Sequence, residues 1–208
     1  RFNAVSPIHV ADTQYTLQGL DVPESISYKE FVSGKPLKPT WFCSHWWGES
    51  IYHFVSCIER HVEVHRLSPE TTGYWVCAYA NDQHNLGFEM GVDVETSSFR
   101  KAMKMASGVL LMLDSKSVAF NRIWCDFEVY KALVDRMKLD VVTVRGHQPE
   151  TVCLLTGDIV PGESSHQKMR REINFPSQIL VKGIRTKLEN GQASVTSDRE
   201  NILRNMAP

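Results

Sequence analysis

The chain has 208 residues, of which 42% are hydrophobic and 23% charged, with a formal net charge of −1 and a pI of about 6.8. This length and composition are ordinary for one well-packed globular domain with extensions. The near-neutral balance gives no argument for nucleic acid or an anionic membrane surface, and no apolar run approaches the roughly 18 residues that span a bilayer. We therefore expect no nucleic acid partner and no membrane span in this segment.

The cysteines favour a reducing compartment. Five of them lie mostly inside apolar stretches without a CxxC pair: Cys43, Cys57, Cys77, Cys125 and Cys153. An odd number of such residues predicts buried, reduced thiols in a cytoplasmic protein rather than a disulfide framework. The sequence begins with Arg1 and shows no initiator Met and no secretory signal pattern, so we expect it to be a piece of a longer protein.

The first part of the chain is weakly patterned up to residue 40. It contains four prolines: Pro7, Pro23, Pro36 and Pro39. We expect residues 1–40 to lie over the core as an extension with at most a short strand or two. The apolar run at 41–44 then predicts a buried strand, and the 3.6-residue spacing of apolar side chains predicts a helix over 50–62, with Ser50 as its cap.

Strands and helices continue to alternate after the first helix. The run GYWVCAYA predicts a second strand at 73–80, and TSSFRKAMKMAS predicts a helix at 96–107. GVLLMLD at 108–114 is the strongest strand pattern, because it is apolar on both faces. A helix at 123–138 and an apolar strand at 140–146 close the series.

Apolar strands that alternate with helices call for a parallel sheet covered on both faces. We predict an α/β fold: a flavodoxin-like open parallel sheet with helices on both faces, within a domain at 41–156. An N-terminal extension at 1–40 and a C-terminal loop and helical extension at 157–208 complete the chain. Ligands in such folds bind outside the carboxyl ends of the strands. Three segments follow strand ends here: 44–49, 80–86 and 114–119.

The C-terminal extension lacks the alternating apolar strands and helices of the α/β domain. Residues 157–172 form a polar stretch that predicts a loop. Residues 175–194 predict an amphipathic helix interrupted at Gly183, and 197–206 predict a capped terminal helix.

Four motifs, in order and at suitable spacing, resemble the TIR domain family over 41–146, about half of the chain. FCS at 42–44 is similar to the first TIR box, where a strand ends in Phe-x-Ser. FRKA at 99–102, leading into SGVLLMLD at 107–114, looks like the family's helix and third strand, and Ser115 follows this strand where the family often has Ser. WCDFE at 124–128 matches the family's W-C-x-x-E, the most specific of the four. The first-box loop SHWWG resembles a group of protist and algal sequences.

This resemblance implies an activity and a catalytic residue. In TIR domains that cleave NAD+, the glutamate of W-C-x-x-E is catalytic, and it corresponds to Glu128. A carboxylate can stabilise the positive charge that develops on the ribose as nicotinamide leaves. Next to Trp124, Glu128 would be partly desolvated, which raises its pKa. We therefore predict an NAD+ glycohydrolase of the TIR type in a signalling protein that undergoes homotypic TIR–TIR assembly, with NAD+ as substrate and no cofactor.

The residues expected to bind the substrate lie on the loops at the strand ends, apart from Trp124. They are Ser44, His45, Trp46, Trp47, Gly48, Asn81, Asp82, Ser115 and Trp124. One tryptophan of the pair 46–47 is expected to stack on an aromatic ring of the substrate, and the other to fill the core. His84 lies on the same loop edge. Arg100, Lys101 and Arg122 are phosphate candidates that are more simply explained as solvated charges.

His53, Cys57, His61 and His65 recur every four residues along the first predicted helix. The outer two would lie about 18 Å apart at 1.5 Å per residue, so all four cannot reach one ion. A pair with ligands from a second element is conceivable, since zinc sites need such convergence. We expect a surface stripe instead, and no metal site.

Two other functions fit the same motifs. The chain could be a non-catalytic TIR self-association and signalling module, since fold alone does not decide activity. It could also be a nucleoside deoxyribosyltransferase-like enzyme, which uses a glutamate on a flavodoxin-like scaffold. Besides these two, the domain could be a degenerate ligand sensor that binds a nucleotide without turnover.

Overall fold

The computed structural model describes residues 27–33, 38–82, 93–146 and 151–206. Within these residues, five strands form one sheet: β1 (Trp41–Ser44), β2 (Tyr74–Trp75), β3 (Gly108–Leu113), β4 (Lys138–Arg145) and β5 (Thr151–Leu155). Their order across the sheet is β2-β1-β3-β4-β5. The first four strands run parallel, and β5 pairs antiparallel with β4. This is the flavodoxin-like strand order, so the predicted fold class is confirmed.

Alternation along the strands assigns each face of the sheet to its own helices. Leu110 and Met112 of β3 pack with side chains of α2 (Ile51–His65). Val109 of β3 packs with α5 (Ser98–Met105), and Leu111 packs with Cys125 of α6 (Ile123–Val134). Because successive side chains of a strand point to opposite faces, α2 covers one face and α5 with α6 the other.

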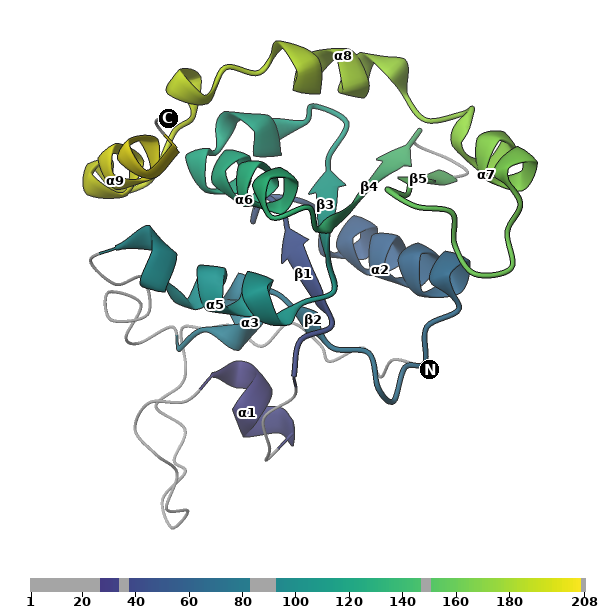
Figure 1. The fold of residues 1–208 in the computed structure, drawn as a ribbon, viewed down its shortest axis with the longest axis horizontal. Helices are drawn as coiled ribbons and strands as arrows, with labels where there is room; N and C mark the ends of the chain where they lie inside the picture. Colours follow the sequence, from purple (N-terminus) through teal and green to yellow (C-terminus); the bar gives the residue numbers. More distant parts are fainter. Residues whose placement is uncertain (1–26, 34–37, 83–92, 147–150, 207–208) are drawn as a thin grey trace.

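The remaining helical elements lie around this core. They are α1 (Tyr28–Ser33), α3 (Cys77–Ala80), η2 (Val94–Thr96), η3 (Val118–Asn121), α7 (Ser165–Glu172), α8 (Ser177–Arg185), η4 (Leu188–Asn190) and α9 (Thr196–Met206). Figure 1 shows the C-terminal segment arching over one side of the molecule, from α7 beside β5 to α9 beside α6. Ile179 of α8 and Ile202 of α9 are buried against the core, so the extension packs onto the α/β unit.

The predicted strand at 73–80 is only partly a strand. Tyr74 and Trp75 pair with the start of β1, and from Cys77 the chain turns into the short helix α3. Cys77 is buried in the same core cluster as Trp75. An apolar run of this length does not distinguish a strand from a buried helical turn, which is why the pattern was misleading.

Strand β5 was not expected from the sequence. Its run TVCLL follows β4 after only residues 146–150, which is too short for the crossover that a parallel neighbour requires. The strand therefore adds to the sheet edge in the antiparallel direction. Arg171 of α7 donates to the carbonyl oxygen of Leu154 at 2.9 Å and so fastens the extension to this edge.

Three further expectations are corrected by the structure. Residues 28–33 form helix α1 where at most strands were expected, and the rest of the extension before residue 27 lies outside the described residues. The polar stretch 157–172 contains helix α7, which begins with a capping box of Ser164 and Gln167. Helix α8 (Ser177–Arg185) continues through Gly183 instead of being interrupted there. A Cβ atom at this position would lie 3.0 Å from the Phe120 ring, so the glycine permits close packing of the helix.

Two expectations about chemistry can be compared with the structure. All five cysteines are buried and free, as predicted from their apolar surroundings. Among the described residues, no helix has the length and hydropathy needed to cross a bilayer.

Arg100 of α5 is a buried ion-paired group rather than a solvated charge. Its Nε atom lies 3.0 Å from Glu95 Oε2, and its Nη1 atom lies 2.5 Å from Asp135 Oδ2. The guanidinium group therefore joins η2, α5 and the end of α6. Its loss would leave two partly buried carboxylates without this partner.

We expect Arg100→Ala to lower the free energy of unfolding by about 1–3 kcal/mol, because the ion pairs and the packing of the stem are both lost. Urea denaturation followed by circular dichroism measures this change. Lys101→Ala is the matched control, since Lys101 is the exposed neighbour on the same helix. Equal destabilisation by the two substitutions would contradict a structural role for the Arg100 ion pairs.

Candidate functional site

The carboxyl end of the sheet carries a pocket of about 190 Å³. It lies between the loop after β1 and helix α3, which follows β2, and so beside the point between β1 and β3 where the strand order reverses and ligands bind in open α/β sheets. The lining residues come from the loop after β1, the start of α2 and helix α3: His45, Trp47, Glu49, Ile51, Phe54, Ala78 and Tyr79. This volume is below the roughly 300–1,000 Å³ of typical ligand pockets, so it suits one aromatic ring rather than a whole dinucleotide.

Two unpaired polar groups belong to this pocket. Both carboxyl oxygens of Glu49 and the Nε2 atom of His45 are buried without a hydrogen-bond partner among the described residues. Burial and the nearby negative charge of Asp114 raise the pKa of Glu49 to about 7. Burial also lowers the pKa of His45, whose ring packs 5.0 Å from that of Phe54. Buried groups without partners are costly, and such groups mark candidate binding sites.

The two tryptophans of the first-box loop have different positions. Trp46 packs against the core cluster that contains Leu111 and Cys125. A side chain on Gly48 would lie 2.3 Å from the Trp46 ring, so Gly48 admits this ring rather than a ligand. Trp47 is 59% exposed and lines the pocket. Of the pair, Trp47 is therefore the one available for stacking.

Glu128 lies on the first half of α6 and is only 4% exposed. Alternation along β1 places Ser44 on the face of the sheet that α6 covers, near the carboxyl group of Glu128. The Ser44 hydroxyl is itself buried without a well-formed hydrogen bond among the described residues. Burial raises the pKa of Glu128 to about 8; the hydroxyl of Ser44 opposes this shift and the charge of Asp126 adds to it. At neutral pH the carboxyl group is therefore mostly protonated in this conformation.

Trp47 connects the open pocket with the surroundings of Glu128. Its Nε1–H group donates to the Cys77 thiol at 2.9 Å. Burial and the charge of Glu128 together raise the pKa of Cys77 to about 12, which places this thiol next to the carboxyl group. Because the rest of the Trp47 ring is exposed, it can move without disturbing the core.

Some of the predicted substrate-binding residues line the pocket, and others lie away from it. Asn81 and Asp82 are buried directly after α3, and Ser115 is exposed in the turn after β3. Trp124 stacks on Phe99 at 5.0 Å and donates from Nε1 to Asp198 Oδ2 at 3.4 Å, so its ring contacts α5 and α9 rather than the pocket lining. His84 lies outside the described residues.

Sequence reasoning missed Glu49, although it directly follows the loop that had been singled out. Glu49 falls within the strand-end segment 44–49, but only residues 44–48 of this segment were predicted to bind the substrate. The expected surface stripe on α2 is also wrong in part, because Cys57 and His61 are fully buried. His61 and His65 face Asp140 of β4 instead of solvent.

Comparisons of the chain with protein-family models, with curated proteins and with solved structures found no match. The fold defines a flavodoxin-like α/β protein with a candidate site at its switch point. The TIR resemblance stays a prediction that rests on the sequence motifs.

The raised pKa of Glu128 predicts a specific dependence of stability on pH. The folded value is about 8 and the ordinary value is 4.5, so the fold favours the protonated form. This contribution to stability is fully present below about pH 4.5 and is lost as the pH rises through 8. Each pKa unit between folded and unfolded protein corresponds to about 1.4 kcal/mol. Glu128→Gln should therefore raise the melting temperature clearly at pH 9 and change it little at pH 5.

Differential scanning fluorimetry at both pH values measures this difference. Glu70→Gln is the control, because Glu70 is exposed and the Ser68 hydroxyl lowers its pKa, which reverses the sign of any effect. A shift of the Glu128→Gln melting temperature that is the same at pH 5 and pH 9 would contradict the burial of an ionisable carboxyl group there.

Proposed function

We propose that the chain is a TIR-like NAD+ glycohydrolase, with Glu128 as the catalytic residue. The observation that supports this most directly is the position of Glu128. Its carboxyl group is buried beside Ser44, at the carboxyl end of β1, and has a pKa raised to about 8. Carboxyl groups with such shifts are concentrated at functional sites.

The chemistry uses the carboxylate as an electrostatic partner of the ribose. The bond between C1′ and the nicotinamide nitrogen breaks, and its electron pair leaves with nicotinamide, which departs as a neutral base. Positive charge develops on the ribose ring, and the ionised Glu128 stabilises it. Water then adds to C1′ and releases one proton, giving ADP-ribose, unless an internal nucleophile closes a cyclic product.

Substrate binding itself favours the reactive state of Glu128. The nicotinamide ring of NAD+ is cationic, and a cation placed near a carboxyl group lowers its pKa. Access requires Trp47 to leave Cys77, after which its indole face can stack on the departing ring. His45 and Glu49 would then supply hydrogen bonds to the ligand from the pocket.

A non-catalytic self-association module is the second candidate, and one observation favours it. Several large apolar side chains are exposed along the C-terminal extension: Ile173, Leu180, Val181 and Ile184, the last of which is 85% exposed. Exposed apolar residues in such a group are typical of interaction surfaces. Homotypic assembly through this surface is compatible with either function.

The first test is NAD+ consumption by concentrated protein, with nicotinamide release measured by chromatography. Glu128→Gln should abolish turnover, because it keeps the shape of the side chain but removes the charge. The value of kcat/KM in the unaltered protein should rise with pH and level off above about 8, since the ionised form is the active one.

Asp126→Asn is the matched control on the same helix. Burial raises the pKa of Asp126 to about 7, but its Oδ2 atom lies against Gly191 rather than in the crevice, so this variant should keep its turnover above pH 8. Because the charge of Asp126 raises the pKa of Glu128, its loss should shift the pH profile toward lower pH. Equal turnover in the unaltered protein and Glu128→Gln would place the chemistry elsewhere. An absence of turnover even in assembled protein would favour the self-association module.

A further inference from the structure

Three potential metal ligands converge at the C-terminal end of α2, away from the crevice. His61 and His65 lie one helical turn apart on α2, and Asp140 comes from β4. The Nε2 atoms of His61 and His65 lie 3.2 Å and 2.6 Å from the same carboxylate oxygen, Asp140 Oδ2. The three potential ligand atoms all lie within 4.8 Å of one another. This supplies the second element that a helical histidine pair needs to bind an ion.

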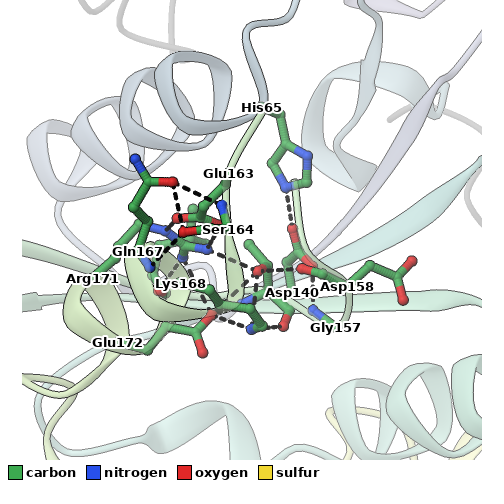
Figure 2. Close-up of polar contacts among 12 residues, drawn as sticks. His65, Asp140, Gly157, Asp158, Glu163, Ser164, Gln167, Lys168, Arg171 and Glu172 are labelled. Carbon is green, nitrogen blue, oxygen red and sulfur yellow. Dashed lines mark hydrogen bonds and ion pairs between the residues drawn. The ribbon is translucent and has the colours of Figure 1, made fainter. Parts of the chain in front are cut away.

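Surrounding groups orient these atoms from the outside. The Tyr74 hydroxyl lies 2.7 Å from His61 Nδ1, and the backbone N–H of Gly157 donates to Asp140 Oδ1 at 2.9 Å. Figure 2 shows His65 pointing at Asp140, with Gly157 on the other side of the carboxylate. Outer hydrogen bonds of this kind fix the ring and the carboxylate of metal ligands, and here they hold both Nε2 atoms next to Oδ2.

The surroundings also favour the ligating protonation states. Burial alone would raise the pKa of Asp140, but hydrogen bonds from His61, His65 and Gly157 outweigh it and hold this pKa at about 2. Burial lowers the pKa of His61, so its imidazole is neutral near pH 7. The nearby cation Arg171 is paired with Glu163 at 2.8 Å and with Glu172 at 3.3 Å, which offsets its charge. Metal ions require ionised carboxylates and neutral imidazoles.

We propose that His61, His65 and Asp140 bind one divalent first-row transition metal ion, with Zn²⁺ as the best match. The ligand atoms are the two Nε2 atoms and Oδ2, a set of nitrogen and oxygen donors that suits Zn²⁺. In the ion-free protein the Nε2–H groups of His61 and His65 donate to Asp140 Oδ2. On binding, the ion replaces these hydrogens, each neutral imidazole takes the tautomer with its proton on Nδ1, and the Tyr74 oxygen accepts this hydrogen from His61. His65 is 12% exposed whereas His61 is fully buried, so a water molecule completes the coordination on the His65 side.

The ion would act as a structural link rather than in the crevice. Helix α2 begins at the pocket with Ile51 and ends at His65, a length of about 21 Å at 1.5 Å per residue. A metal ion at its far end joins α2 to β4 and, through Gly157, to the start of the C-terminal extension. This proposal is therefore independent of the NAD+ glycohydrolase activity.

The test is titration of chelator-treated protein with Zn²⁺, followed by isothermal calorimetry and by the melting temperature. We expect one ion per chain and a higher melting temperature. His65→Gln keeps a donor to Asp140 but lacks the imidazole, and it should weaken binding by roughly 100-fold or more. Tyr74→Phe should weaken binding by roughly 10- to 100-fold, because it removes only the outer hydrogen bond.

His53→Ala is the matched control on the same helix, and it should leave Zn²⁺ binding unchanged. Binding that survives His65→Gln but is lost in His53→Ala would place the ion at the crevice and overturn the proposal. So would a lack of saturable binding by the unaltered protein. Co²⁺ gives a second measurement on the unaltered protein, because a sulfur-to-metal charge-transfer band would show cysteine ligands and contradict the assigned set.

Discussion

The six residues of β3 are all buried, so the middle of the sheet meets water on neither face. Helices must therefore cover both sides, and the chain must leave β1 toward β2 on one side and return to β3 on the other. That reversal creates the switch point at which the loops after β1 and β3 diverge. The pocket, the exposed Trp47 and the carboxyl group of Glu49 lie beside this switch point, on the side of β1 that faces β2.

Helix α6 places an ionisable group, the carboxyl group of Glu128, in this region, and its burial costs folding free energy. Cys125 and Phe127 of this helix are buried in the core, and Glu128, which follows them directly, is buried as well. The Ser44 hydroxyl only partly compensates the lost hydration, and the pKa stays near 8. An apolar side chain at position 128 would make the folded state more stable than the buried carboxyl group does. A contribution to stability therefore does not explain this carboxyl group, whereas the proposed catalytic role does.

The alternation of strands and helices could be predicted because it depends on local apolar patterns such as that of 108–113. The strand β5 could have been found as well, since its short connection to β4 permits only an antiparallel neighbour. The burial of His61 could not, because its partner Asp140 is 79 residues away in the chain. The same applies to Trp124, whose position depends on Asp198 in the terminal helix. Periodicity reports which face of a helix is apolar, but it does not report which distant polar group lies opposite.

Asp140 and Glu128 show why burial alone does not identify a functional carboxylate. Both side chains are almost inaccessible, yet the pKa of Asp140 is about 2 and that of Glu128 about 8. The difference comes from the donors around them, since Asp140 accepts hydrogen bonds from two imidazoles and one backbone amide. For Glu128, only the nearby Ser44 hydroxyl lowers the pKa, whereas burial and the charge of Asp126 raise it. Asp140 is thus stabilised as an anion, as a ligand or ion-pair partner must be. For Glu128, no cation of the part of the chain that the structure describes offsets the charge of the ionised form, and a cationic substrate is the kind of ligand that would do so.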